Sequence, residues 1–143
     1  MGEGPDRAEI EAVVDELGLT GSVTLAGFVP NPYERMATAD LFVLSSLSEG
    51  MPLTLLEALA VGAPVVSTRC EGGPATLLGE GRYGDLVPSG SVEALAGAME
   101  RALREPGPLR AKARRGPGRA REFDADRAAR ALLRLLGELS ARR

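Results

Sequence analysis

Apolar residues along the chain fall into short runs that alternate between a helical and an extended period. Ile10, Val13, Val14 and Leu17 recur at helical spacing and predict a first helix. Asp6, with Glu9 three residues later, resembles a capping box at the start of this helix, and Gly18 stands where helices end. The short, β-branched segment Val23–Ala26 predicts a strand, which Gly27 and Pro30 would stop.

The same alternation continues to the end of the chain. Leu41–Leu44 is a continuous apolar run, typical of a strand that is covered on both faces. The other expected elements are a brief helix over 33–39, a helix over 53–61 between Pro52 and Gly62, a strand over 64–67, a short helix over 73–78, a strand over 84–87, a helix capped by Ser91 with Val92, Leu95, Met99 and Leu103 inward, and a last helix over 124–141. This order predicts an α/β fold with a Rossmann-like parallel sheet and flanking helices, whose ligands bind at the carboxyl ends of the strands.

Composition narrows the class of protein. Hydrophobic residues make up 44% of the 143 residues and charged residues 26%, which excludes intrinsic disorder. The chain has no histidine and one cysteine, Cys70, so histidine-based catalysis and a disulfide framework are excluded, and we expect Cys70 to be a reduced packing residue. No apolar run is long enough to cross a bilayer. We therefore expect a cytoplasmic domain.

Charge is distributed unevenly along the chain. Residues 1–100 carry four basic and fifteen acidic side chains, whereas residues 101–143 carry twelve arginines and Lys112 against five acids. The expected layout is a main domain over 1–105, a basic connector with Pro and Gly over 106–122, and an amphipathic helix over 123–143. The basic part is either solvated or has an anionic partner, such as a weak peripheral contact with a membrane. Nucleic acid is not expected, because no aromatic residue lies between Gly84 and Phe123 to stack on bases.

The stretch Ser48–Pro64 carries the candidate chemistry. It follows an apolar strand and opens a helix, so the N–H groups of Gly50, Met51, Leu53 and Thr54 lie near a helix N-terminus that suits a diphosphate. Pro52 has no backbone N–H, so it leaves no donor without a partner in the first turn. Glu49 and Glu57 flank this anion site. Because like charges repel, we expect these two carboxylates to accept hydrogen bonds from hydroxyl groups, as sugars provide.

With Glu49 and Glu57 spaced as Glu-x7-Glu, this stretch resembles the signature of family 4 retaining glycosyltransferases, which have the GT-B fold of two facing Rossmann-like domains. Other segments resemble the same family: Gly2–Pro5, Gly27–Pro30, Arg69–Pro74 and Tyr83–Pro88. The resemblance covers roughly residues 1–105. It implies a partial C-terminal, donor-binding half of a GT-B enzyme.

The resemblance also implies roles for individual residues. Glu49 would be the catalytic residue that faces the hydroxyls of the transferred sugar, and Glu57 would accept hydrogen bonds from the ribose. The remaining donor-binding residues would be Gly50, Met51, Pro52 and Leu53 at the sugar and diphosphate, and Phe28, Val29 and Pro30 at the base. The donor would be a UDP- or GDP-type nucleotide sugar. Neither a metal nor another cofactor is expected, and the acceptor would be a glycan or a lipid-linked sugar bound by an N-terminal domain.

Parts of the family pattern have no counterpart in the chain, namely its first two strands, an Arg/Lys pair and the acceptor domain. We therefore expect an N-terminally truncated piece of a longer glycosyltransferase. In that case Val23–Ala26 would lack neighbouring strands, and the strand at Leu41–Leu44 would have an open edge. The alternatives are a non-catalytic nucleotide-sugar-binding module and one half of a split enzyme. A Rossmann oxidoreductase is not favoured, because no Gly-rich fingerprint follows a strand.

Overall fold

The structure is a computed structural model that describes residues 2–140. The chain divides into two compact units, residues 1–34 and 35–143, and each is considered by itself. The predicted end of the last helix, at Ala141, lies outside the described residues.

The second unit is built on a parallel sheet, as the sequence predicts. Its strands are β1 (Phe42–Leu44), β2 (Val65–Arg69) and β3 (Asp85–Pro88), in the order β1-β2-β3. Ser67 at the centre of β2 is aligned with Leu44 on one side and Leu86 on the other. Within the described part of the chain β1 pairs only with β2, so the expected open edge at β1 is present.

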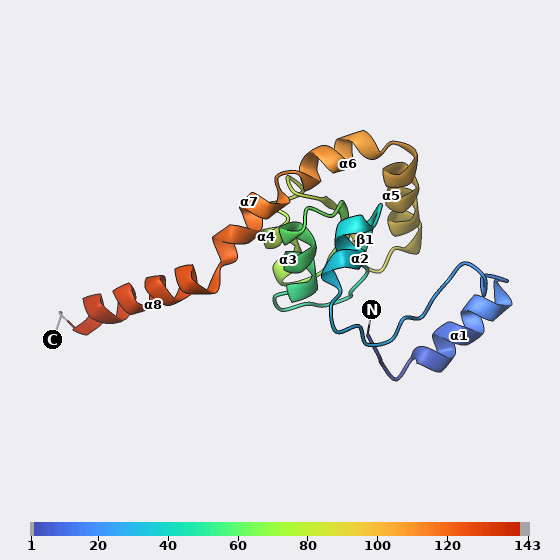
Figure 1. The fold of residues 1–143 in the computed structure, drawn as a ribbon, viewed down its shortest axis with the longest axis horizontal. Helices are drawn as coiled ribbons and strands as arrows, with labels where there is room; N and C mark the ends of the chain where they lie inside the picture. The colour runs from blue at the N-terminus through green and yellow to red at the C-terminus, as the bar shows by residue number, and fades with distance from the viewer. Residues whose placement is uncertain (1, 141–143) are drawn as a thin grey trace. The chain divides into compact units, whose positions relative to one another are not determined.

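Helices cover both faces of this sheet. Successive side chains of β2 point to opposite faces, and four of its five residues are buried. Val65 packs in a cluster with residues of α3 (Leu53–Ala60) and α4 (Gly73–Leu77). Val66 packs on the other face, against α5 (Val92–Arg104) and α6 (Pro106–Ala113). In Figure 1, α3 in green and α5 in gold-brown lie on either side of the strands. Met36 of the short helix α2 (Tyr33–Thr38) is also buried.

Helix α5 faces the sheet with a stripe that agrees only in part with the predicted one: Leu95 packs on the Val66 cluster as expected. Ser91 caps it as expected, accepting a hydrogen bond from the N–H of Ala94. However, Ala98 and Ala102 are the buried residues, whereas Val92 is 76% exposed and Leu103 is 57% exposed. Two alanines one turn apart let the helix backbone come close to the sheet. The expectation that Val92 and Leu103 point inward was therefore wrong.

The predicted basic connector is helical. It packs through Leu109, Ala113 and Gly116, whereas most of its arginines are exposed. It forms α6, α7 (Gly116–Ala120) and a 3₁₀ turn, η1 (Arg121–Phe123). Pro106 and Pro117 fall in the first turns of α6 and α7, where a missing N–H costs nothing. At Gly116 a Cβ atom would lie 2.7 Å from the carbonyl oxygen of Leu59, so this glycine permits the close packing of α7 on α3.

Basic residues of these helices pair with acidic residues of the sheet unit. Lys112 lies 2.7 Å from Asp85, and Arg110 lies 3.2 Å from Asp40. Arg119 donates hydrogen bonds to the carbonyl oxygens of Thr76 and Leu77, at 2.6 and 3.2 Å. Part of the uneven charge is thus compensated by ion pairs within the chain.

The last described helix, α8 (Ala125–Ser140), is amphipathic as predicted. Its leucine stripe is more than half exposed, at Leu132, Leu135, Leu136 and Leu139. Arg127, Arg130 and Arg134 lie on the opposite face, given 3.6 residues per turn. Over residues 2–140, none of the helices is long and apolar enough to cross a membrane.

The described residues of the first unit contain α1 (Arg7–Glu16) and the first two residues of α2. Gly18 ends α1 in the left-handed region, at φ +66°, as expected. The capping box is wrong, because the Asp6 side chain makes no capping hydrogen bond. The strand at Val23–Ala26 is also wrong: the segment has no strand pairing, and the carbonyl oxygen of Leu25 accepts from the Arg7 guanidinium instead. Strand propensity alone does not make a strand without a neighbour.

Candidate active site

The predicted site lies where the chain leaves the carboxyl end of β1. The loop after β1 and the loop after β2 are joined there by an isolated parallel bridge between Ser48 and Glu71. The N–H of Glu49 donates to the carbonyl oxygen of Glu71 at 3.3 Å, and the N–H of Gly73 donates to that of Gly50 at 2.7 Å. The structure thus brings the Glu49 loop and the 70–73 loop together at the edge where parallel sheets bind ligands.

Gly72 and Gly73 make this contact possible. Gly72 has φ +100° and ψ −138°, a conformation that is essentially restricted to glycine. A Cβ atom at Gly72 would overlap the carbonyl oxygen of Glu49, and one at Gly73 would lie 2.7 Å from the carbonyl oxygen of Gly50. The backbone of the Glu49 loop therefore rests directly on a glycine pair.

The Glu49 side chain is held by a short polar network. Its Oε1 accepts a hydrogen bond from Ser46 Oγ at 2.6 Å. Ser46 is held in turn, because the buried hydroxyl of Thr68 donates to the carbonyl oxygen of Ser46 at 2.6 Å. Among the described residues, Oε2 of Glu49 has no hydrogen-bond partner. A half-buried carboxylate with one oxygen fixed and the other open is suited to accept a hydrogen bond from a bound hydroxyl.

The N-terminus of α3 is open next to Glu49. Pro52 is buried and precedes the helix without a side-chain cap. No backbone acceptor within residues 2–140 takes the N–H groups of Met51, Leu53 and Thr54. Met51 and Leu53 are 52% and 64% exposed, so a ligand can reach this turn. Unpaired donors and the positive end of the helix dipole favour an anion here.

The other predicted residues are placed as follows. Glu57 is half-buried on α3, one turn after Leu53, and it has an interaction partner in the structure. Phe28, Val29 and Pro30 belong to the first unit, where Phe28 is 78% exposed. Their place in a donor site stays a prediction, as do the roles of Glu49 and Glu57.

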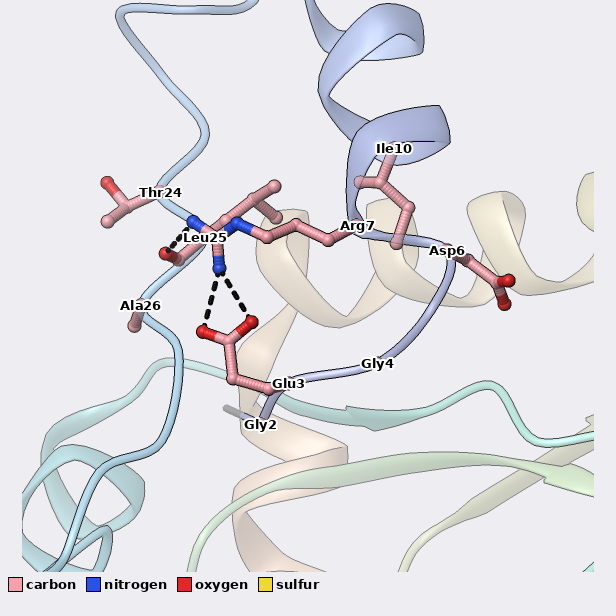
Figure 2. A pocket seen from close by; sticks show the side chains of 9 residues that line it. All are labelled: Gly2, Glu3, Gly4, Asp6, Arg7, Ile10, Thr24, Leu25 and Ala26. Carbon is pink, nitrogen blue, oxygen red and sulfur yellow. Dashed lines mark hydrogen bonds and ion pairs between the residues drawn. The ribbon is translucent and has the colours of Figure 1, made fainter.

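A pocket of about 250 Å³ lies within the first unit (Figure 2). Arg7 crosses it: the guanidinium lies 2.9 Å from Glu3 and 2.9 Å from Glu11, and it donates to the carbonyl oxygen of Leu25 at 3.2 Å. The hydrogen bonds that Arg7 donates, first to Glu3 and then to Glu11, raise the pKa of Arg7 above its ordinary value. Because two carboxylates already compensate this cation, the pocket offers little to a diphosphate.

No group of three or more His, Cys, Asp or Glu side chains in the described chain is placed to hold a metal ion. Cys70 is a free, buried thiol, as expected of a packing residue.

Comparison with known proteins decides the family. The family model "Glycosyl transferases group 1" matches residues 1–117, which is most of the chain. The chain belongs to the group 1 glycosyltransferases. A solved structure of HepE from Anabaena in complex with UDP superposes with a TM-score of 0.84 at 25% identity, over 92% of this chain and 36% of that one. The structural neighbours of this glycosyltransferase chain have the GT-B fold, as predicted.

Two curated relatives extend the comparison. This glycosyltransferase chain is 36% identical to an exopolysaccharide phosphotransferase of Streptomyces coelicolor, over 100% of the chain and 15% of that protein. It is 32% identical to N-acetylgalactosamine-N,N'-diacetylbacillosaminyl-diphospho-undecaprenol 4-alpha-N-acetylgalactosaminyltransferase of Campylobacter jejuni, over 95% of the chain and 37% of that enzyme. The chain thus spans much less than half the length of these relatives.

Sequence reasoning missed Ser46, Thr68 and the role of Gly72. Ser46 precedes Glu49 by three residues, a spacing at which a hydroxyl can reach a carboxylate within a turn. The pair Gly72-Gly73 was a visible sign of close backbone approach. Thr68 carried no such sign, because its contact with Ser46 joins residues 22 apart in the chain.

Proposed function

We propose that this chain is the donor-binding part of a retaining glycosyltransferase of family 4. In this proposal it binds a UDP- or GDP-type nucleotide sugar, and the longer enzyme transfers the sugar to a glycan or a lipid-linked acceptor. The observation that carries the proposal is the open N-terminus of α3 beside Glu49, at the carboxyl edge of a parallel sheet. The Anabaena neighbour, whose structure contains UDP, supports the nucleotide part. The Campylobacter relative, whose name includes a diphospho-undecaprenol, supports a lipid-linked acceptor.

Each residue has a physical task in this proposal. The N–H groups of Met51, Leu53 and Thr54 would stabilise the negative charge that develops on the leaving diphosphate, which is a large contribution when donors are fixed in advance. Glu49 would accept a hydrogen bond from a sugar hydroxyl through Oε2, and Glu57 from the ribose. The Gly27–Pro30 loop would contact the base. No step in this scheme requires a metal.

Calorimetry with UDP, GDP, UDP-glucose and GDP-mannose tests the donor site. We expect at least one nucleotide to bind the chain, and Glu57→Gln to weaken binding of that nucleotide about tenfold, because an ionic hydrogen bond to the ribose contributes ~1.5 kcal/mol. Glu138→Gln on the exposed helix α8 removes the same charge and should leave binding unchanged. Failure of all four ligands to bind the wild-type chain would contradict the proposal.

A nucleotide-sugar-binding module, or one half of a split enzyme, is the second candidate. Turnover tests this candidate. Hydrolysis or transfer of the sugar by the chain alone would rule the non-catalytic module out, whereas binding without turnover agrees with both candidates.

We also propose a cytoplasmic location with a weak peripheral membrane contact. The exposed leucines and the arginines of α8 support it, because such a helix can lie at a membrane interface. Co-sedimentation with anionic liposomes should then occur and weaken as salt is added. Absent or salt-independent pelleting would contradict the membrane contact.

A further inference from the structure

A series of hydrogen-bonded hydroxyl groups, which begins at Thr68 inside the sheet, holds the Glu49 side chain at the proposed site. Thr68, 3% exposed in β2, donates from Oγ1 to the carbonyl oxygen of Ser46 at 2.6 Å and, at a longer 3.5 Å, to that of Leu44. Both acceptors lie at or just after the end of β1. The buried hydroxyl therefore ties the β1 exit to the neighbouring strand at the residues that lead into the Glu49 loop.

Ser46 connects this series of hydrogen bonds to the Glu49 carboxylate. Its Oγ donates to Oε1 of Glu49 at 2.6 Å, which is the short distance of a hydrogen bond to an ionised acceptor. The Glu49 backbone is held separately, by the hydrogen bond of its N–H to Glu71. With the main chain and one carboxylate oxygen both fixed, the direction of Oε2 is determined before any ligand arrives.

We propose that Ser46 is a positioning residue for sugar recognition, and that Thr68 holds Ser46 in place. The proposal rests on the proposed function, because it assumes that Glu49 faces the donor sugar. Ser46 does not touch the donor in this scheme. It restricts the Glu49 carboxylate to one orientation, so that the carboxylate does not have to be ordered when the sugar binds.

The binding test separates sugar recognition from nucleotide recognition. The quantity measured is the ratio of the affinities of a nucleotide sugar and its nucleotide, with UDP-glucose against UDP and GDP-mannose against GDP. We expect Ser46→Ala to reduce this ratio about tenfold while the affinity for the nucleotide alone stays unchanged. Ser46→Thr, which keeps the hydroxyl, should retain most of the ratio. Ser45→Ala is the matched control, because Ser45 is exposed. Equal losses for nucleotide and nucleotide sugar would overturn the proposal, because they indicate a structural role only.

A second measurement needs no donor. Side-chain NMR couplings of Glu49 report whether it occupies one rotamer, and thermal unfolding reports whether each variant is folded. We expect a single Glu49 rotamer in the wild type and in Ser45→Ala, and averaging among rotamers in folded Ser46→Ala. Thr68→Val, which removes the buried hydroxyl at nearly constant volume, should produce the same averaging. A Glu49 that keeps one rotamer in Ser46→Ala would overturn the positioning role. Absence of nucleotide binding by a wild type with an ordered Glu49 would instead overturn the proposed function.

Discussion

Replacing Gly72 by alanine should separate the two loops that form the candidate site. Gly72 is the residue on which the carbonyl group of Glu49 rests, and an added Cβ would overlap the oxygen and lie 2.9 Å from the carbon of that group. The contact is with backbone on both sides, so a side-chain rotation cannot relieve it. The Glu49 loop must move away from β2 or the backbone at Gly72 must change conformation.

Two contributions determine how much Gly72→Ala lowers the free energy of unfolding. Alanine at φ +100° and ψ −138° is strained by about 1–3 kcal/mol, because that region is almost exclusive to glycine. Moving the loop also breaks the hydrogen bonds from Glu49 to Glu71 and from Gly73 to Gly50, at about 1 kcal/mol each. Together these predict a loss of roughly 3–5 kcal/mol from the free energy of unfolding, a large part of the 5–15 kcal/mol of an ordinary domain.

Gly90→Ala is the matched control for strain. Gly90 also has a left-handed φ, +78°, but no atom lies within 4 Å of the position of its added Cβ. Its cost should therefore be the conformational strain alone, roughly 1–2 kcal/mol. Chemical denaturation of both variants measures the difference, and calorimetry should show loss of donor binding only in Gly72→Ala. A Gly72→Ala protein that is no less stable than Gly90→Ala would refute the reasoning from loop contact.

Three further substitutions test the packing around the site by denaturant unfolding. Arg119→Ala should lower the free energy of unfolding by about 2–4 kcal/mol, because the carbonyl oxygens of Thr76 and Leu77 lose the hydrogen bonds of a largely buried guanidinium. Arg119→Lys should restore only part of this stability. Leu55→Ala should cost about 2–5 kcal/mol, because Leu55 is fully buried beneath the site, and a smaller loss would mean that α3 is not packed as described. Ser91→Ala should cost about 1 kcal/mol through loss of the α5 cap, whereas no change would show that the cap hydrogen bond does not contribute.

The sheet and the site loop were predictable because their signals are local. Leu41–Leu44 is an apolar run of the right length for a strand, and Pro52 with Gly62 marks the two ends of α3. The position of Glu49 at the carboxyl edge of the sheet was also predictable from a local signal, because the motif directly follows the strand. A parallel strand followed by a helix leaves its connecting loop at the carboxyl edge, whatever the rest of the chain does.

The wrong predictions concern segments whose structure depends on contacts with distant parts of the chain. Val23–Ala26 has strand propensity, but a strand also needs a neighbour, and none pairs with it in the described chain. In α5 the larger side chains Val92 and Leu103 were expected inside, yet close packing on the sheet selected Ala98 and Ala102. These choices depend on contacts between distant residues, which periodicity in one sequence does not contain.

The groups that orient Glu49 lie close together in the chain. Every group that orients Glu49 comes from residues 44–73 of the second unit, within or beside its buried sheet. The proposed base contacts, Phe28 to Pro30, come instead from the first unit, whose helix α1 has no buried residue in the described chain. We therefore expect Phe28→Ala to leave the ratio of the affinities for UDP-glucose and UDP unchanged, as measured by calorimetry. Loss of this ratio in Phe28→Ala would contradict the expectation that residues 44–73 alone orient Glu49.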